Sequence, residues 1–332
     1  MAKQQNTKPA RAGRVSARRG DGRAGSRGRS PHPQSKRLPH PPVWFSRAVA
    51  ARFEERFIDV RGCRIRFSRW GKAGPAGPVF VHGGYAHAHW WDFIAPFFQD
   101  EQGVVALDLS GMGDSGHRQA YTAGTFAQEV MSVCAAAGLA DRPVVVGHSF
   151  GGWVALKTGV IHGADLAGVV LVDYPIRPPG HEPESGRPRS RPRQLHLSLE
   201  AALRRFKLLP SQPCANQFIL DYIARRSVRK VAGGWSWKFD ERLFDGFEPG
   251  NPAEDVAALT CRVAVIHGEQ SALFPRETIH YMSKLLQADA PLLSIPDAHH
   301  HVFLDQPLAF VAALRALLAQ WRHASPAKVC PA

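Results

Sequence analysis

The sequence predicts an α/β fold with a doubly wound, mostly parallel, eight-stranded sheet, because strand-like and helix-like patterns alternate along most of the chain. Residues 56–61 and 63–70 alternate apolar and polar side chains on either side of Gly62, which is typical of an antiparallel hairpin. Continuous apolar runs, typical of strands buried on both faces, follow in six places. They are residues 78–81, 104–109, 143–146, 168–172, 262–266 and 292–295.

Helical patterns fill the intervals between these runs. They fall near residues 90–98, 126–137, 152–161, 276–286 and 307–321. Because parallel strands need long crossover connections, which are usually helices, this spacing supports a doubly wound sheet.

One region, residues 176–255, interrupts the alternation after the sixth strand. It begins with a Pro/Arg-rich loop over 177–193, continues with helical patterns at 197–208 and 217–231, and ends in an aromatic patch. We expect a helical cap here, inserted into a core made of residues 43–175 and 256–325. Such a cap would cover the carboxyl ends of the strands, where open α/β sheets bind ligands.

Most of the basic excess lies at the N-terminus. The chain has 332 residues and a net charge of +14, and residues 1–42 hold eleven Lys and Arg against one acid, Asp21, so they carry +10 of it. This Arg-, Gly-, Ser- and Pro-rich stretch buries too little apolar surface to fold, and we expect a disordered tail. The alternative is an electrostatic arm for nucleic acid or an anionic membrane. Nucleic acid is otherwise not an expected partner.

Cysteine usage and hydropathy indicate a cytoplasmic protein. The five cysteines show no paired spacing, which favours reduced thiols over a disulfide framework or a zinc site. The sequence has no apolar run of about eighteen residues and no signal-peptide core, so no membrane span is expected.

The motif G-x-S-x-G occurs at residues 147–151, between the apolar run 143–146 and the helical pattern 152–161. A serine on a sharp strand-to-helix turn exposes its hydroxyl oxygen, and close approach of the flanking backbone requires glycine. This nucleophile elbow predicts Ser149 as a nucleophile.

The segment HGGY at residues 82–85 ends the third predicted strand. In folds with such a serine turn, that loop supplies one N–H group of an oxyanion hole, and the residue after the nucleophile supplies the other. We assign these donors to Gly84 and Phe150. A plain tight turn at residues 82–85 is the alternative.

Three adjacent histidines, at positions 299–301, follow the last predicted strand. A histidine there respects the chain order serine, acid, histidine of a catalytic triad. Adjacent histidines also suggest a metal, but consecutive residues do not easily converge on one ion, so we expect no metal.

With these motifs, residues 55 to 322 resemble the α/β-hydrolase superfamily, in the lineage with a helical cap. The turn at residues 108–115, DLSGMGDS, is similar to the family's D-x-x-G-x-G-x-S, and Trp91 follows the HGGY segment as in relatives. In the family the catalytic histidine lies five residues before an acid-x-Pro ending, which is matched by residues 305–307. The resemblance therefore implies that His300 is the base and that no cofactor is needed.

The triad acid departs from the family pattern. Relatives usually carry it after the seventh strand, where this chain has Ser271 and Ala272. Haloalkane-dehalogenase-like relatives place it at the end of the sixth strand, where this chain has Asp173, our first choice because a strand-end carboxylate is rigidly held. Glu269 is the alternative acid, and a dyad without an acid is a third option.

Several other residues near the predicted site have two interpretations. Asp108 and Asp114 are interpreted as structural acids that accept hydrogen bonds from backbone amides. Aromatic residues could line an apolar substrate pocket or pack between cap and sheet. The candidates are Tyr85, Trp91, Trp235 and Trp237.

Together these residues predict a serine hydrolase (esterase-like) that acts by acyl transfer on a carboxylic ester or lactone of a small apolar molecule. A carbon–carbon bond hydrolase, a thioesterase and a haloperoxidase are alternatives on the same triad. A non-catalytic ligand-binding protein is the alternative from another class. A serine nucleophile argues against haloalkane dehalogenases and epoxide hydrolases, which resemble this family but use a carboxylate.

Overall fold

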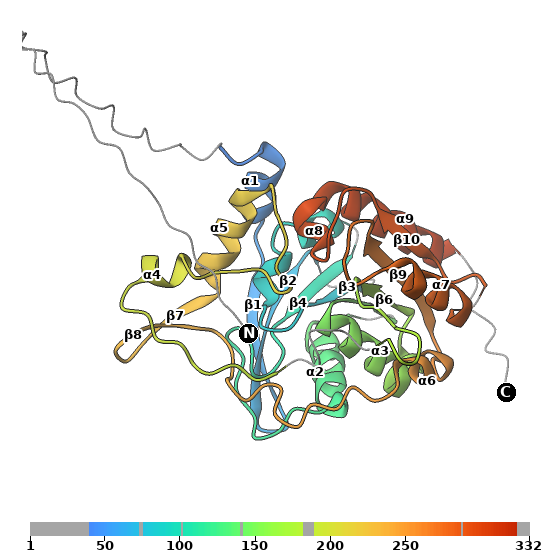
Figure 1. The fold of residues 1–332 in the computed structure, drawn as a ribbon, viewed down its shortest axis with the longest axis horizontal. Coiled ribbons are helices and arrows are strands. Elements are labelled where there is room, and N and C mark those ends of the chain that lie inside the picture. Colours follow the sequence, from blue (N-terminus) through green and yellow to red (C-terminus); the bar gives the residue numbers. More distant parts are fainter. Residues whose placement is uncertain are drawn as a thin grey trace, which may run out of the picture. The chain divides into compact units, whose positions relative to one another are not determined.

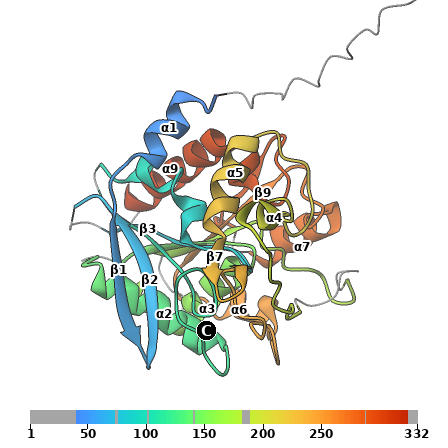
Figure 2. The same ribbon diagram turned by 90° about the vertical axis from the view of Figure 1, so that its left-hand side faces the viewer.

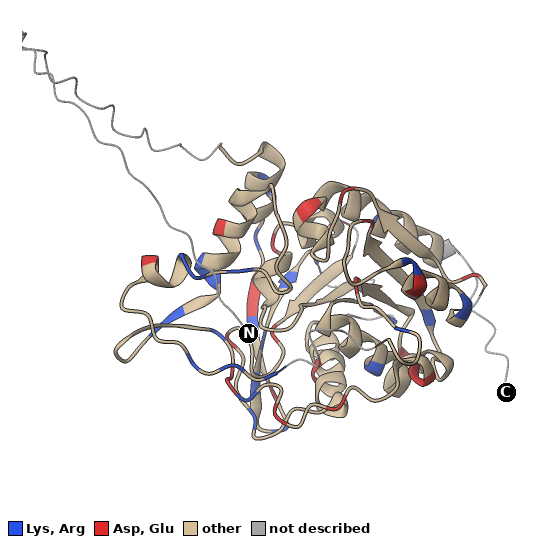
Figure 3. Ribbon diagram, viewed as in Figure 1, with Lys and Arg blue, Asp and Glu red and all other residues tan. Residues whose placement is uncertain are grey.

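A computed structural model describes residues 40–72, 76–100, 102–139, 142–181, 189–286 and 288–323. Nearly all of the predicted basic tail, part of the Pro/Arg-rich loop and Cys330 therefore lie outside the described residues. In Figure 3, basic and acidic residues are interspersed along the described elements. The four described cysteines form no disulfide: Cys63, Cys134, Cys214 and Cys261.

The centre of the fold is an eight-stranded sheet with strand order β1-β2-β4-β3-β5-β6-β9-β10 (Figure 1). Strands β1 and β2 form an antiparallel hairpin and β2 pairs antiparallel with β4, whereas all other neighbours are parallel. The strands are β1 Glu54–Val60, β2 Cys63–Trp70, β3 Ala76–Val81, β4 Gly103–Leu107, β5 Val144–His148, β6 Gly168–Val172, β9 Arg262–Gly268 and β10 Leu292–Ile295. The predicted mostly parallel, eight-stranded sheet is confirmed.

Successive residues of the central strands point to opposite faces, so each strand contributes to two apolar cores. In β3, Phe80 packs into one core, whereas Val79 and Val81 pack into the other. The first core contains α1 Val43–Val49, η1 Ala88–Trp91, η2 Ala95–Phe98, α8 Val302–Asp305 and α9 Pro307–His323. The second contains α2 Ala123–Ala136, α3 Phe150–His162, α6 Pro252–Ala257 and α7 Arg276–Leu285. A short turn, η3 Gly163–Asp165, follows α3. Helices thus cover both faces, as Figures 1 and 2 show.

The region between β6 and β9 contains short helices and a second, two-stranded sheet. Its elements are α4 Leu199–Leu203, α5 Gln217–Arg226, β7 Val228–Val231, β8 Gly234–Trp237 and α6. The helix predicted over 217–231 is wrong at its end, because α5 stops at Arg226 and residues 228–231 form a strand. Two β-branched valines flank two basic residues there, and Gly233, with φ of 81°, makes the turn into β8.

Aromatic residues attach α5 to a helix that the sequence patterns did not predict. Phe45 of α1 lies 4.9 Å from Phe218 and 5.6 Å from Tyr222, between ring centroids. The two helices lie next to each other in Figure 1. The helix expected over 90–98 is instead two short 3₁₀ turns, η1 and η2. None of the helices in the described ranges combines the length and apolar character that crossing a bilayer requires.

Candidate active site

Ser149 occupies a strained turn between β5 and α3. Its φ of 53° and ψ of −118° lie outside the regions that L-residues favour, which is a frequent feature of functional sites. A Cβ added to Gly147 would lie 1.9 Å from the carbonyl oxygen of Gly151, and one added to Gly151 would lie 2.4 Å from that of Val81. Both glycines are therefore required by close backbone contacts, as expected for a nucleophile elbow.

The loop after β3 lies against the start of α3. A Cβ added to Gly84 would lie 3.6 Å from Cβ of Phe150, so these two residues are close neighbours beside Ser149. The backbone N–H groups of Gly84 and Phe150 donate none of the turn, loop and cap hydrogen bonds found among the described residues. Phe150 is the first residue of α3, and its N–H has no acceptor within the helix. Both predicted oxyanion donors are thus adjacent and available.

His82 and Asp108 hold this loop in place. Nδ1 of His82 lies 2.8 Å from the carbonyl oxygen of Gly83, and Nε2 accepts a hydrogen bond from the Leu109 amide at 3.1 Å. Burial lowers the pKa of His82, which keeps the ring neutral. The Asp108 carboxylate accepts hydrogen bonds from the amides of Ala88 and Asp114, in agreement with its structural interpretation.

The contacts of Asp114 differ from those that the sequence predicted. Its carboxylate pairs with the ammonium group of Lys238 at 2.6 Å rather than with backbone amides. The pair links the turn after β4 to the segment that follows β8. The partner comes from a distant part of the chain, so the local turn motif did not reveal it.

The three adjacent histidines have three different partners. Nδ1 of His300 lies 2.7 Å from Oδ1 of Asp173, and both side chains are buried. Nδ1 of His299 lies 3.3 Å from Oδ2 of Asp305, and Nδ1 of His301 lies 2.8 Å from Oε1 of Gln212. The structure therefore brings His300, of the three, to the strand-end acid that the sequence favoured.

Asp173 is held by donors from the end of β9 and from the loop that follows it. Its Oδ1 also accepts a hydrogen bond from Oγ of Ser271 at 2.7 Å, and its Oδ2 accepts one from the Gly268 amide at 2.9 Å. Sequence reasoning treated Ser271 as a vacant acid position and missed this contact. The signal was available, because a hydroxyl at that position can donate to a neighbouring carboxylate.

The alternative acid, Glu269, is not brought to the base. Its side chain is exposed, and its Oε2 accepts a hydrogen bond from the Asp297 amide at 3.3 Å. Nε2 of His300 is buried, and no hydrogen-bond partner reaches it from the described part of the chain, Oγ of Ser149 included. His300 therefore has its Nδ1 paired with Asp173, whereas its Nε2 has no partner among the described residues.

A cavity of about 1070 Å³ opens beside Ser149, and Gly84 and Phe150 line it as well. Its aromatic walls come from the loop after β3, from α3, from the region between β6 and β9, and from α7. They are Tyr85, Phe150, Trp153, Tyr174, Phe244, Phe247 and Tyr281. Tyr85, a predicted pocket residue, thus lines this cavity, and its hydroxyl donates a hydrogen bond to the carbonyl oxygen of Arg189.

Three other predicted pocket residues lie elsewhere. Trp91 has no exposed surface, because it stacks between Phe80 and Phe303, with ring centroids 4.7 Å and 4.3 Å away. Trp235 and Trp237 belong to β8 and do not line the cavity. For these tryptophans the pocket prediction was wrong. Trp91 packs in the core, and the backbone of Trp235 pairs with that of His196.

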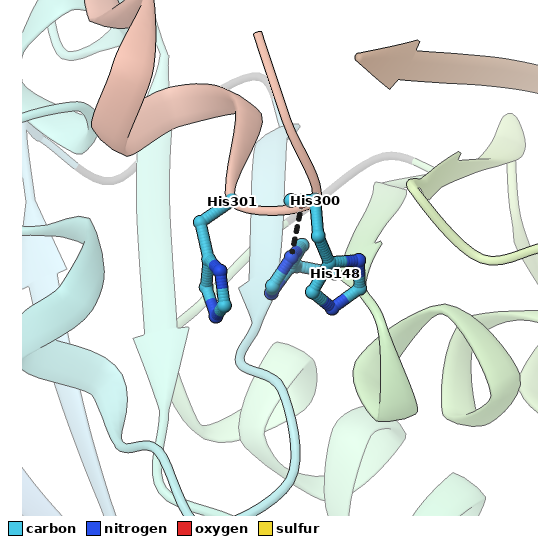
Figure 4. A group of neighbouring side chains, drawn as sticks. All are labelled: His148, His300 and His301. Atoms are coloured by element: carbon cyan, nitrogen blue, oxygen red, sulfur yellow. Dashed lines mark hydrogen bonds between the residues drawn. The ribbon is translucent and has the colours of Figure 1, made fainter. Parts of the chain in front are cut away.

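His148, which precedes the nucleophile, lies against the histidine loop (Figure 4). Its Nε2 is 3.1 Å from the carbonyl oxygen of His300. One ring nitrogen each from His148, His300 and His301 lies within 4.8 Å of the other two. Burial lowers the pKa values of His148 and His301 well below the usual range, so both rings are neutral. The argument against a metal considered the adjacent histidines alone and overlooked His148.

The fold, the strained serine turn and the buried His–Asp pair define an α/β-fold hydrolase. The model of the alpha/beta hydrolase family matches residues 79–314, and the chain belongs to this family.

Similar proteins include esterases and lipases. An esterase of Mycobacterium tuberculosis, Rv0045c, is 25% identical over 278 residues, which cover 78% of this chain and 88% of the relative. A monoacylglycerol lipase of Mycolicibacterium smegmatis is 26% identical over 275 residues, which cover 76% of this chain and 92% of the relative. The solved thioesterase domain of the curacin biosynthetic pathway superposes with a TM-score of 0.66 at 20% identity, covering 80% of this chain and 99% of that domain.

Proposed function

We propose that this hydrolase is a serine esterase that transfers an acyl group through a triad of Ser149, His300 and Asp173. The observation that carries the proposal is the 2.7 Å contact between His300 and Asp173, buried beside a strained serine turn. Two of the similar proteins are named esterase and monoacylglycerol lipase, which supports an ester substrate.

In the proposed reaction, the N–H group at Nδ1 of His300 donates a hydrogen bond to Asp173. The proton stays on Nδ1, so the lone pair is on Nε2. Nε2 takes the hydroxyl proton of Ser149 while Oγ attacks the ester carbonyl carbon. The C–O bond to the alcohol breaks, and the alcohol leaves with the proton from His300. Water then attacks the acyl-serine while Nε2 of His300 takes its proton. The bond from the acyl carbon to Oγ of Ser149 breaks, His300 returns the proton to Oγ, and the acid is released.

The oxygen of the tetrahedral intermediate carries a negative charge that needs donors. The amides of Gly84 and Phe150 lie on the two segments beside Ser149 and have no acceptor among the loop and cap hydrogen bonds described. Each such donor lowers the barrier by about 3 kcal/mol. We therefore propose these two amides as the oxyanion hole. No cofactor takes part in any of these steps.

The aromatic walls of the cavity support a substrate with an apolar acyl or alcohol part, as an ester or lactone. Burial of apolar area against such walls contributes about 25 cal/mol per Å². The region between β6 and β9, which supplies several of these walls, is proposed as the cap that selects the substrate.

Labelling with a fluorophosphonate probe tests the proposal without knowledge of the substrate. We expect an adduct on Ser149, mapped by mass spectrometry, that is absent in Ser149→Ala and strongly reduced in His300→Ala. Ser283→Ala, at an exposed position of α7, is the matched control and should label fully. Folded protein that resists this probe and a smaller one has no activated serine, which would support a non-catalytic ligand-binding protein instead.

A further inference from the structure

We infer that His148, His300 and His301 form a binding site for a divalent transition-metal ion, with Zn²⁺ as the ion of choice, next to Ser149. The three rings come from the end of β5 and from the loop before α8, and Figure 4 shows them facing a common space. One nitrogen from each ring lies within 4.8 Å of the other two.

Hydrogen bonds fix which nitrogen of each ring carries the proton. An imidazole can pair with a carboxylate or carbonyl oxygen only through N–H. Nδ1 of His300 faces Asp173, Nδ1 of His301 faces the amide oxygen of Gln212, and Nε2 of His148 faces a backbone carbonyl. The orientation of the Gln212 amide is itself fixed, because its NH₂ group donates to Asp305 at 2.9 Å.

The opposite nitrogen of each ring therefore carries a lone pair. Nδ1 of His148 and Nε2 of His300 are buried and have no hydrogen-bond partner in the described part of the chain. Buried lone pairs of this kind stay unsatisfied unless a cation, a proton donor or water lies beside them. Neutral imidazole nitrogens are the ligands that zinc and its neighbours prefer.

The hydrogen bonds on the far side of the rings are those found in metal sites. Histidine ligands nearly always donate their second N–H to a carboxylate, an amide or backbone carbonyl, or water, which fixes the ring and raises its basicity. Each of the three rings has such a partner: Asp173, Gln212 and the carbonyl of His300. The rings thus have the tautomers and the supporting hydrogen bonds that metal ligation requires.

Space for an ion is present beside the cluster. His148, His301 and Ser149 line a small cavity of about 40 Å³, which exceeds the room that a single water needs. In a tetrahedral site with Zn–N bonds of about 2.1 Å, ligand nitrogens lie about 3.4 Å apart. The three nitrogens lie within 4.8 Å of one another without an ion, so binding would require the rings to draw closer together. Three histidines leave a fourth position for water or for Oγ of Ser149.

A metal ion at this site would take the lone pair of Nε2 of His300. The consequence for activity rests on the proposed function: with this lone pair bound to the ion, His300 would be unable to accept the serine proton. We therefore expect Zn²⁺ to inhibit hydrolysis reversibly. Metal binding itself does not depend on the proposed function.

Binding is measured on the full chain with Zn²⁺ by calorimetry and with Co²⁺ by visible absorption. We expect one tight equivalent of Zn²⁺ and the intense bands of a tetrahedral Co²⁺ site. X-ray absorption on the wild-type zinc complex should count three imidazole ligands, which needs no variant. Fewer than three imidazoles, or octahedral Co²⁺ alone, would overturn the proposal as adventitious surface binding.

Variants locate the site. His301→Asn and His148→Asn should each weaken Zn²⁺ binding at least about tenfold, whereas His280→Asn, exposed on α7, should leave it unchanged. Ser149→Ala should still bind the ion, which separates binding from activity. Zinc binding without hydrolysis by the metal-free chain would contradict the proposed function alone. Hydrolysis that is insensitive to Zn²⁺, with no tight equivalent bound, would contradict the metal site alone.

Discussion

Oγ of Ser271 lies 2.7 Å from Oδ1 of Asp173, the same carboxylate oxygen that faces His300. Ser271 stands where the family resemblance places the triad acid, and the proposed acid, Asp173, stands at the end of the neighbouring strand β6. Because β6 and β9 are adjacent and parallel, their strand ends lie side by side. A carboxylate from either strand can therefore reach the same histidine, and the other strand can supply a donor to hold it.

Ser271→Ala should lower kcat about fivefold with little change in KM. The substitution removes one hydrogen bond to the charged carboxylate, worth about 1 kcal/mol, and lets Asp173 move relative to His300. Steady-state hydrolysis of a p-nitrophenyl ester measures the effect, with Ser283→Ala as the control on an exposed serine. An unchanged kcat would show that Ser271 only fills space.

Asp173→Asn should lower kcat by about 10⁴, because the amide favours the wrong tautomer of His300. Glu269→Gln should change kcat less than twofold, since Glu269 is exposed and faces the Asp297 amide instead. Both variants are compared by kcat on the same ester and by thermal unfolding. The reverse ranking would move the acid to Glu269, and equal small effects would favour a dyad.

A rescue experiment tests whether the two strand ends are interchangeable. Adding Ser271→Asp to the Asp173→Asn variant should recover about 10-fold or more of the lost kcat, because a carboxylate returns within reach of His300. Ser271→Asn in the same background has the same size without the charge and is the matched control. Equal kcat values in the two double variants would show that position 271 cannot orient the base.

The elements with strong local patterns could be predicted from the sequence. All eight strands of the main sheet and helices α2, α3, α7 and α9 appear within a few residues of their predicted positions. The hairpin of β7 and β8 was missed, since four residues give too short a pattern to separate a strand from the end of α5. Helix α1 was missed because its seven residues give too short a pattern, and the packing of its aromatic residues against α5 is not visible in the sequence.

The same distinction between local patterns and distant contacts applies to the site residues. Ser149, Gly84 and His300 follow from local motifs, whose spacing fixes their place in the turn or loop. Trp91 could not be assigned, because an aromatic residue near a motif fits a pocket wall as well as a core. Its stacking with Phe303, more than two hundred residues away in sequence, decides for the core. Contacts at such separation leave no local pattern.

Stability should fall as the pH drops below about 6.5, and His87 contributes to this fall. His87 is buried, with Nε2 2.9 Å from Oγ of Ser227. Its pKa is lowered well below the ordinary value, first by burial and then by the electrostatic effect of nearby basic side chains. These groups are His89, His82, Lys238 and Arg66. The folded state therefore keeps this ring neutral at a pH where the unfolded chain binds a proton.

The sign follows from proton linkage. Above about pH 6.5 the ring is neutral in both states and stability does not change with pH through this group. Below it the unfolded state alone gains the proton, which costs about 1.4 kcal/mol of stability per pH unit until the folded pKa is reached. His87→Gln should remove the contribution of His87 to this pH dependence. The free energy of unfolding of the variant should therefore vary less steeply between pH 6.5 and 5 than that of the wild type. Urea unfolding at each pH measures the difference, with His280→Gln as control. Parallel curves for wild type and His87→Gln would mean that the buried ring accepts a proton without loss of stability.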